Sequence, residues 1–118
     1  MRQILVVEDN EVMMVSMART LEKAGYNVTT TADPRNALEL VQTSYFDLVI
    51  TDLLMPFLSG LDVLKFIKSF TPERKVLMFS SKSDERTKMD CYHAGAEDYI
   101  NKQTSLAELA IRVKRLIG

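Results

Sequence analysis

Near its start the chain reads Ile4-Leu5-Val6-Val7-Glu8-Asp9, a continuous apolar run that stops at two acids. An apolar run without polar alternation is typical of a strand buried on both faces, as in a parallel sheet. The run is too short for the core of a signal peptide or for a membrane span. It predicts a buried strand with Glu8 and Asp9 at its carboxyl end.

The same pattern is repeated along the chain, with helical stretches between the apolar runs. Helix boundaries are marked by Gly25, by Asp33-Pro34 and by Ser105 with Glu108. Five strands that alternate with five helices imply right-handed crossovers, so we expect an α/β domain with a doubly wound parallel sheet and helices on both faces. The runs predict strands at 4–7, 28–31, 48–51, 76–79 and 99–100, and helices at 11–24, 34–41, 61–68, 83–94 and 106–117.

Composition excludes several classes of protein. The chain has 118 residues, of which 47% are hydrophobic and 26% charged, so we expect one folded domain over residues 1–118 rather than a disordered chain. A net charge of -1 gives no electrostatic reason to bind nucleic acid or an anionic membrane. Cys91 is the only cysteine and His93 the only histidine, which excludes an internal disulfide and a zinc cluster of Cys and His ligands. A reducing, cytoplasmic location fits best.

Chemically active side chains follow four of the five expected strands. Glu8 and Asp9 follow the first strand, Asp52 the third, Ser80 the fourth, and Lys102 the fifth. In an open parallel sheet, ligands bind outside the carboxyl ends of the strands, so these groups are expected to share one edge. Single acids after a strand are also common as helix-starting residues. Agreement among all four strand ends favours a functional site.

Three carboxylates at one edge need a cation to balance them. Two unit charges about 4 Å apart repel by about 4 kcal/mol at an effective dielectric constant near 20. A set of oxygen ligands favours a hard divalent ion such as Mg²⁺. A metal, the amine of Lys102 and a hydroxyl around an aspartate suit phosphoryl transfer, and an aspartate can itself form an acyl phosphate. Asp52 is the central candidate.

The ordered set of motifs resembles the receiver domain of two-component response regulators, the family typified by CheY. The resemblance covers the whole chain and implies a flavodoxin-like sheet with strand order 2-1-3-4-5. The motifs that carry it are Ile4-Leu5-Val6-Val7-Glu8-Asp9-Asn10, Asp52-Leu53-Leu54-Met55-Pro56, Gly60 and Ala94-Gly95-Ala96-Glu97-Asp98-Tyr99-Ile100.

The resemblance also implies a role for each matching position. Asp52 is similar to the phosphorylated aspartate and, with Asp9, to a ligand of Mg²⁺ or Mn²⁺, while Glu8 takes the outer acidic position. Leu54 matches the residue whose backbone carbonyl binds the metal. Three further positions match those that respond to the phosphoryl group: Lys102 would pair with it, Ser80 would be the switch hydroxyl, and Tyr99 the aromatic that changes rotamer.

One position departs from the family pattern. The family lysine is usually followed by proline in a cis peptide, whereas Lys102 is followed by Gln103. A non-proline cis bond costs about 3 kcal/mol. We therefore predict a trans bond and a slightly displaced Lys102.

The resemblance predicts a signalling phosphoacceptor rather than an enzyme with turnover. It would take a phosphoryl group from a histidine kinase or a histidine phosphotransfer protein and switch the surface of the fourth helix, fifth strand and fifth helix. The resemblance is compatible with a phosphorylation-dependent homodimer and does not identify the output partner. One alternative is a receiver fold that acts as an interaction module without phosphate. Another is an aspartyl-nucleophile phosphatase, but such enzymes need a second aspartate where Leu54 stands. A dinucleotide or flavin site lacks the Gly-rich loop after the first strand.

Overall fold

The computed structural model describes all 118 residues, and its centre is a five-stranded sheet in the order β2-β1-β3-β4-β5. Every neighbouring pair of strands is parallel, so the predicted order and sheet type are confirmed. The strands are β1 (Gln3–Val7), β2 (Asn27–Thr31), β3 (Leu48–Thr51), β4 (Lys75–Ser80) and β5 (Asp98–Asn101). The helices are α1 (Glu11–Lys23), α2 (Pro34–Thr43), α3 (Gly60–Phe70), α4 (Glu85–His93) and α5 (Leu106–Ile117).

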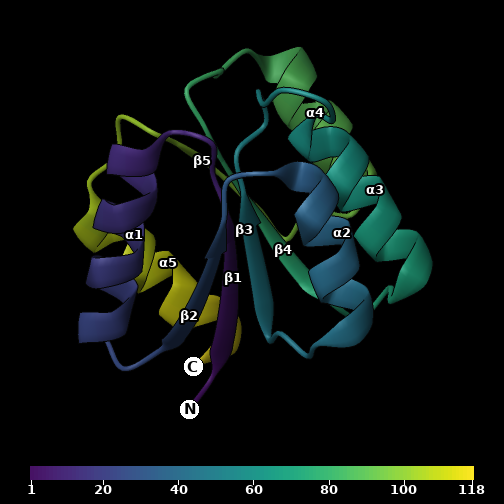
Figure 1. The fold of residues 1–118 in the computed structure, drawn as a ribbon. Helices are drawn as coiled ribbons and strands as arrows, with labels where there is room; N and C mark the ends of the chain where they lie inside the picture. The colour runs from purple at the N-terminus through teal and green to yellow at the C-terminus, as the bar shows by residue number, and fades with distance from the viewer.

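Helices cover both faces of the sheet in two layers. Figure 1 shows α1 and α5 on one face and α2, α3 and α4 on the other. Successive side chains of a strand point to opposite faces, so the apolar run of β1 supplies both cores. Leu5 and Val7 pack with residues of α2, α3 and α4, whereas Ile4 and Val6 pack with residues of α1 and α5. A strand buried on both sides explains why this run has no polar alternation.

The helix ends differ from the sequence prediction by one or two residues, except at α5. The fourth helix was expected from residue 83, but α4 begins at Glu85 because the Asp84 side chain caps it by accepting from Thr87 N at 3.1 Å. It ends at His93, one residue before the expected end. α1 likewise ends one residue early, and α2 and α3 each run two residues further than expected. The fifth helix spans the predicted residues.

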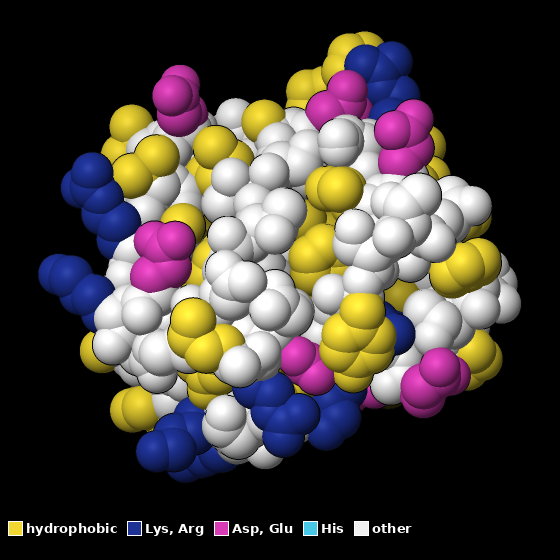
Figure 2. All heavy atoms as spheres, turned by 60° about the horizontal axis from the view of Figure 1, so that its bottom comes forward, with side chains coloured by type: hydrophobic (Ala, Val, Ile, Leu, Met, Phe, Trp, Pro, Cys, Tyr) yellow, Lys and Arg dark blue, Asp and Glu magenta, His cyan; other side chains and the backbone are white.

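Both chain termini lie at the end of the molecule away from the carboxyl ends of the strands (Figure 1). Figure 2 turns this end toward the viewer and shows Lys and Arg side chains gathered along its lower rim, with hydrophobic side chains in small groups between polar ones. Scattered apolar side chains are ordinary on a solvent-facing surface. No helix is long and apolar enough to cross a membrane. The groups singled out in the sequence lie at the opposite, carboxyl edge.

Candidate functional site

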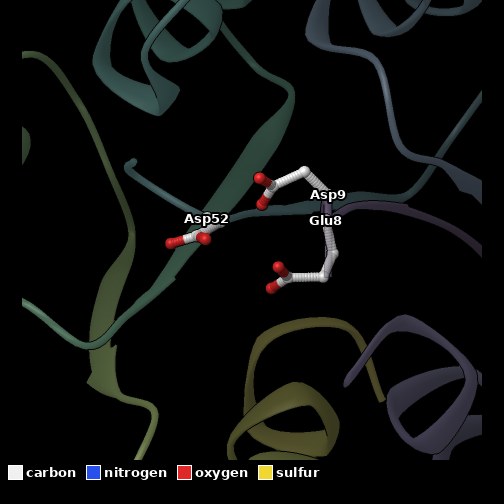
Figure 3. Close-up of side chains that lie close together, drawn as sticks. All are labelled: Glu8, Asp9 and Asp52. Atoms are coloured by element: carbon white, nitrogen blue, oxygen red, sulfur yellow. The ribbon is translucent and has the colours of Figure 1, made fainter. Parts of the chain in front are cut away.

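The acidic residues meet because β1 and β3 are neighbours in the sheet. Val7 and Thr51 are register partners, and Asp52 N donates a 3.0 Å hydrogen bond to Val7 O. One carboxylate oxygen from each of Glu8, Asp9 and Asp52 lies within 4.8 Å of the others. Figure 3 shows Glu8 and Asp9 leaving the chain in opposite directions, with their carboxylates beside Asp52. The predicted acidic cluster is therefore present.

Lys102 joins this cluster from the loop after β5, a strand at the edge of the sheet. Its Nζ lies 2.9 Å from Asp52 Oδ2 and 2.6 Å from Glu8 Oε1. Glu8 is 1% exposed and Asp52 7%, whereas Asp9 is exposed to solvent. The lysine thus bridges the two buried acids and leaves Asp9 open to ligands from solution.

Burial and ion pairing shift the pKa values of Glu8 and Lys102 in opposite directions. Burial raises the pKa of Glu8, although hydrogen bonds from Lys102 and from the backbone of Asn10 act against it. For Lys102, burial alone lowers the pKa, but the bonds to Glu8 and Asp52 outweigh it and the pKa is raised. Lys102 is therefore held in its charged form, and Glu8 takes up a proton more readily than a free glutamate.

The donor set fits a divalent cation. Glu8 Oε1 is buried and forms an ion pair with Lys102 Nζ, which lies 2.6 Å away. When all are ionised, three carboxylates and one ammonium leave two negative charges, which a divalent ion neutralises. Oxygen ligands with one exposed member suit Mg²⁺, which keeps several of its waters. The acidic cluster thus fits a magnesium site.

The two predicted switch residues both contact the backbone of Lys82. Ser80 is fully buried, and its Oγ accepts a hydrogen bond from Lys82 N at 3.2 Å. Tyr99 is 5% exposed, and its hydroxyl donates to Lys82 O at 2.5 Å. Burial raises the pKa of Tyr99, so its hydroxyl remains a donor at neutral pH. The structure thus joins Ser80 and Tyr99 through the loop after β4, while a contact of Ser80 with the phosphoryl group and a rotamer change of Tyr99 stay predictions.

The peptide bond between Lys102 and Gln103 is trans, because the chain contains no cis peptide bond. The prediction made from the missing proline is therefore confirmed. Asn101 shapes the turn instead: its side chain accepts from Gln103 N at 2.7 Å and its carbonyl from Thr104 N at 2.9 Å. Lys102 still reaches Asp52, and the extent of its displacement stays a prediction.

Sequence reasoning missed one feature at the start of α3 and one in the loop before it, residues 52–59. A Cβ at Gly60 would lie 1.9 Å from the backbone oxygen of Asp52, so only glycine fits against the acidic cluster. Phe57 has a φ of 76° and is stacked under the guanidinium of Arg35. Glycine after a Met-Pro turn is a sequence signal for the first feature. The second joins residues far apart in the chain, and no local pattern indicates it.

Comparison with known proteins agrees with this geometry. Residues 4–114 match the family model described as response regulator receiver domain. The chain therefore belongs to the receiver domains of response regulators, a family of signalling domains.

Its relatives are transcriptional and response regulators. The chain is 34% identical to the alkaline phosphatase synthesis transcriptional regulatory protein PhoP of Bacillus subtilis, over 98% of this chain and 48% of that protein. It is 32% identical to the response regulator ArlR of Staphylococcus aureus, over 99% of this chain and 53% of that protein. The chain thus spans about half the length of these curated relatives.

Solved structures show the same fold. The non-phosphorylated HemR receiver domain of Leptospira biflexa has a TM-score of 0.94 at 28% identity, covering 100% of this chain and 95% of that one. The response regulator TrrA of Thermotoga maritima, solved in complex with Mg²⁺ and BeF, has a TM-score of 0.90 at 31% identity, covering 98% and 99%. The chemotaxis protein CheY4 of Vibrio cholerae has a TM-score of 0.92 at 28% identity, covering 98% of each chain.

Proposed function

We propose that this domain accepts a phosphoryl group on Asp52 from a histidine kinase or a histidine phosphotransfer protein, in a reaction that needs Mg²⁺ or Mn²⁺. The observation that carries the proposal is the position of Asp52, whose carboxylate lies 2.9 Å from Lys102 Nζ and within 4.8 Å of two further carboxylates. Such a set provides an oxygen nucleophile, a fixed positive charge and a cation site at one point. Phosphoryl transfer depends on positioning and charge neutralisation of this kind.

Each side chain has a separate task in the proposed reaction. The carboxylate of Asp52 attacks phosphorus, the bond from phosphorus to the donor nitrogen breaks, and the donor imidazole keeps the electron pair. Lys102 is held in its charged form 2.9 Å from Asp52 Oδ2 and would pair with the phosphoryl oxygens. Asp9, Asp52 and the backbone carbonyl of Leu54 would hold the metal, with Glu8 behind them. The metal supplies a positive charge that neutralises the transferred group.

The metal assignment has support from a relative. TrrA, at 31% identity to this chain, was solved with Mg²⁺ and BeF. In this chain, the carboxylate oxygens of Glu8, Asp9 and Asp52 that lie within 4.8 Å of one another support the same use of the acidic cluster.

A bound phosphoryl group would move Ser80. The Oγ of Ser80 accepts from Lys82 N, so turning to donate to the phosphoryl group breaks that bond and frees the loop that Tyr99 also holds. A hydrogen bond to a charged group contributes about 1.5–3 kcal/mol, whereas shifting a population from about 1:99 to 99:1 needs about 5.5 kcal/mol. Lys102 and the repositioned Tyr99 must supply the rest, and the surface of α4, β5 and α5 would change.

The wider setting is also part of the proposal. The relatives that this chain matches are about twice its length and include transcriptional regulators, so an output domain or partner, and a phosphorylation-dependent homodimer, would receive the signal. A cytoplasmic location agrees with the single, fully buried thiol of Cys91. Nucleic-acid binding by this domain itself is not proposed, because its net charge is -1.

The test is the intact mass of the protein after incubation with acetyl phosphate, with and without Mg²⁺. We expect a Mg²⁺-dependent gain of one phosphoryl group in the wild type and in the control Asp90→Asn, and none in Asp52→Asn. Asp90 is a matched acid on α4 whose side chain is 50% exposed. A gain retained in Asp52→Asn would refute the assignment. No gain from any donor, including a phosphorylated histidine protein, would favour an interaction module.

The switch is tested separately. In Ser80→Ala, phosphorylation should proceed but the active conformation, measured by NMR shifts of α4 and β5, should be less populated than in the wild type. An unchanged population would contradict the role of Ser80.

A further inference from the structure

The loop between β3 and α3 contains a bulky residue in an unfavourable backbone conformation. Phe57 has a φ of 76° and a side chain that is 70% exposed. Large side chains rarely adopt left-handed backbone angles, and such outliers persist only where surrounding contacts maintain them. Burial of the ring is not the reason here, so another contact must hold the residue in place.

That contact is a guanidinium from the first turn of α2. The Cζ of Arg35 lies 3.6 Å from the centre of the Phe57 ring. Arg35 is fixed from behind by Asp33, with Nε 3.1 Å from Oδ1 and an Nη 2.9 Å from Oδ2. Asp33 is itself fixed, because it caps α2 through Arg35 N at 2.9 Å and its backbone N–H donates to Thr31 Oγ1 at 3.2 Å. We call Asp33, Arg35 and Phe57 the Arg35 clasp.

Few other contacts fix the conformation of the β3–α3 loop around Phe57. Gly60 N donates to Leu53 O at 2.7 Å and Leu58 N to Pro56 O at 2.9 Å, but no backbone N–H of residues 54–57 donates a hydrogen bond within the protein. Met55 packs partly against the core. Between residues 54 and 57 the loop is therefore held by the packing of Met55 against the core and, at the solvent side, by the Arg35 clasp.

We propose that the Arg35 clasp positions the β3–α3 loop so that the backbone carbonyl of Leu54 is ready to bind the metal beside Asp52. This inference rests on the proposed function and adds three positioning residues, none of which touches the metal or the phosphoryl group. A loop ordered before binding loses less conformational freedom when the ion arrives, so affinity rises without any new contact to the ion.

The direction of the change in Mg²⁺ affinity distinguishes a positioning role of the clasp from a direct effect of the Arg35 charge. Arg35 carries a positive charge, so the loss of that charge alone should tighten the binding of a cation. Loss of the clasp should weaken it. Phe57→Leu changes no charge and is therefore the decisive variant. An exposed cation–π contact predicts that its loss weakens Mg²⁺ affinity by about two- to five-fold.

The experiment is calorimetric titration of Mg²⁺ into the unphosphorylated domain. The variants are Phe57→Leu, Arg35→Gln and their combination, with Phe57→Tyr as the conservative variant and Arg115→Gln as a charge-matched control on exposed α5 surface. We expect weaker binding in Phe57→Leu and no further loss when Arg35→Gln is added, because both changes break one contact. Phe57→Tyr keeps the ring and should keep wild-type affinity, as should the control.

Two outcomes would overturn the inference. One is wild-type Mg²⁺ affinity in Phe57→Leu with only a lower melting temperature of the metal-free protein, since that is a purely structural role. The other is weaker binding in the combined variant than in Phe57→Leu, because the two changes would then not break one shared contact. Failure of the proposed function looks different, because then the wild type itself would bind no Mg²⁺ or gain no phosphoryl group on Asp52.

Discussion

Replacing Lys102 by methionine would test the electrostatics of the site. Lys102 is the cation that separates two buried acids, with side-chain exposures of 1% for Glu8 and 8% for Asp52. Methionine has a similar length but no charge. Removing one partner from a buried ion pair costs about 3–5 kcal/mol, because the remaining charge has no compensation.

The structure gives an independent figure for the same change. Glu8 and Asp52 present oxygens within 4.8 Å of each other. At that distance two unit charges repel by about 3 kcal/mol at an effective dielectric constant near 20. We therefore expect Lys102→Met to lower the free energy of unfolding by about 3 kcal/mol at about pH 8 without metal.

The loss of unfolding free energy in Lys102→Met relative to the wild type should depend on pH. The pKa of Glu8 is raised above its ordinary value of 4.5 by burial, and losing Lys102 raises it further. A carboxyl group with a raised folded-state pKa contributes stability below its unfolded pKa and loses that stability as the pH rises through the folded pKa. The difference between wild type and variant should therefore shrink as the pH falls from about 8 towards 4.5.

Urea unfolding followed by far-UV circular dichroism measures this difference across the pH range. Lys65→Met, an exposed lysine on α3, is the control and should change stability by no more than about 0.5 kcal/mol. Mg²⁺ should stabilise Lys102→Met more than the wild type, because the variant site carries one more uncompensated negative charge. A deficit below about 1 kcal/mol at high pH, or one that does not vary with pH, would refute this reasoning.

Three further changes probe how the site is held. Gly60→Ala places a Cβ against the backbone oxygen of Asp52, so we expect a loss of about 3 kcal/mol or more in urea unfolding together with slower phosphorylation; normal stability would contradict the crowding. Tyr99→Phe removes the donor to Lys82 O and should cost about 1 kcal/mol, with faster amide hydrogen exchange in the loop after β4 and unchanged exchange in β1. Ser59→Ala removes the cap of α3 and should lower stability by about 1 kcal/mol while leaving Mg²⁺ affinity unchanged, and a drop in affinity would show that the cap also positions the metal site.

Much of the fold followed from local sequence. The run at Ile4–Val7 predicted a strand buried on both faces, and the structure gives each of its four side chains to one core or the other. Parallel strands put their carboxyl ends at one edge, so Asp52 and Lys102 were expected together and lie 2.9 Å apart. Helix ends were less well predicted, because a single capping side chain such as that of Asp84 fixes them.

The resemblance went further than the local pattern. The strand order was implied by the family motifs, since periodicity alone does not say which strands are neighbours. The roles of Ser80 and Tyr99 came from the same source, and the structure adds that both hold Lys82.

The sequence by itself determined which groups stand at the carboxyl edge, because strand periodicity and crossover handedness are set by local chemistry. Only the tertiary structure decided which of these groups are buried and which are exposed at that edge. Adjacent Glu8 and Asp9 have opposite environments, one buried against Lys102 and one open to solvent, because successive side chains leave the chain in opposite directions. Arg35 in the first turn of α2 meets Phe57 of the β3–α3 loop, although β1 separates β2 from β3 in the sheet. Such contacts depend on loop dihedrals and rotamers fixed by residues distant in the chain, and no local pattern records them.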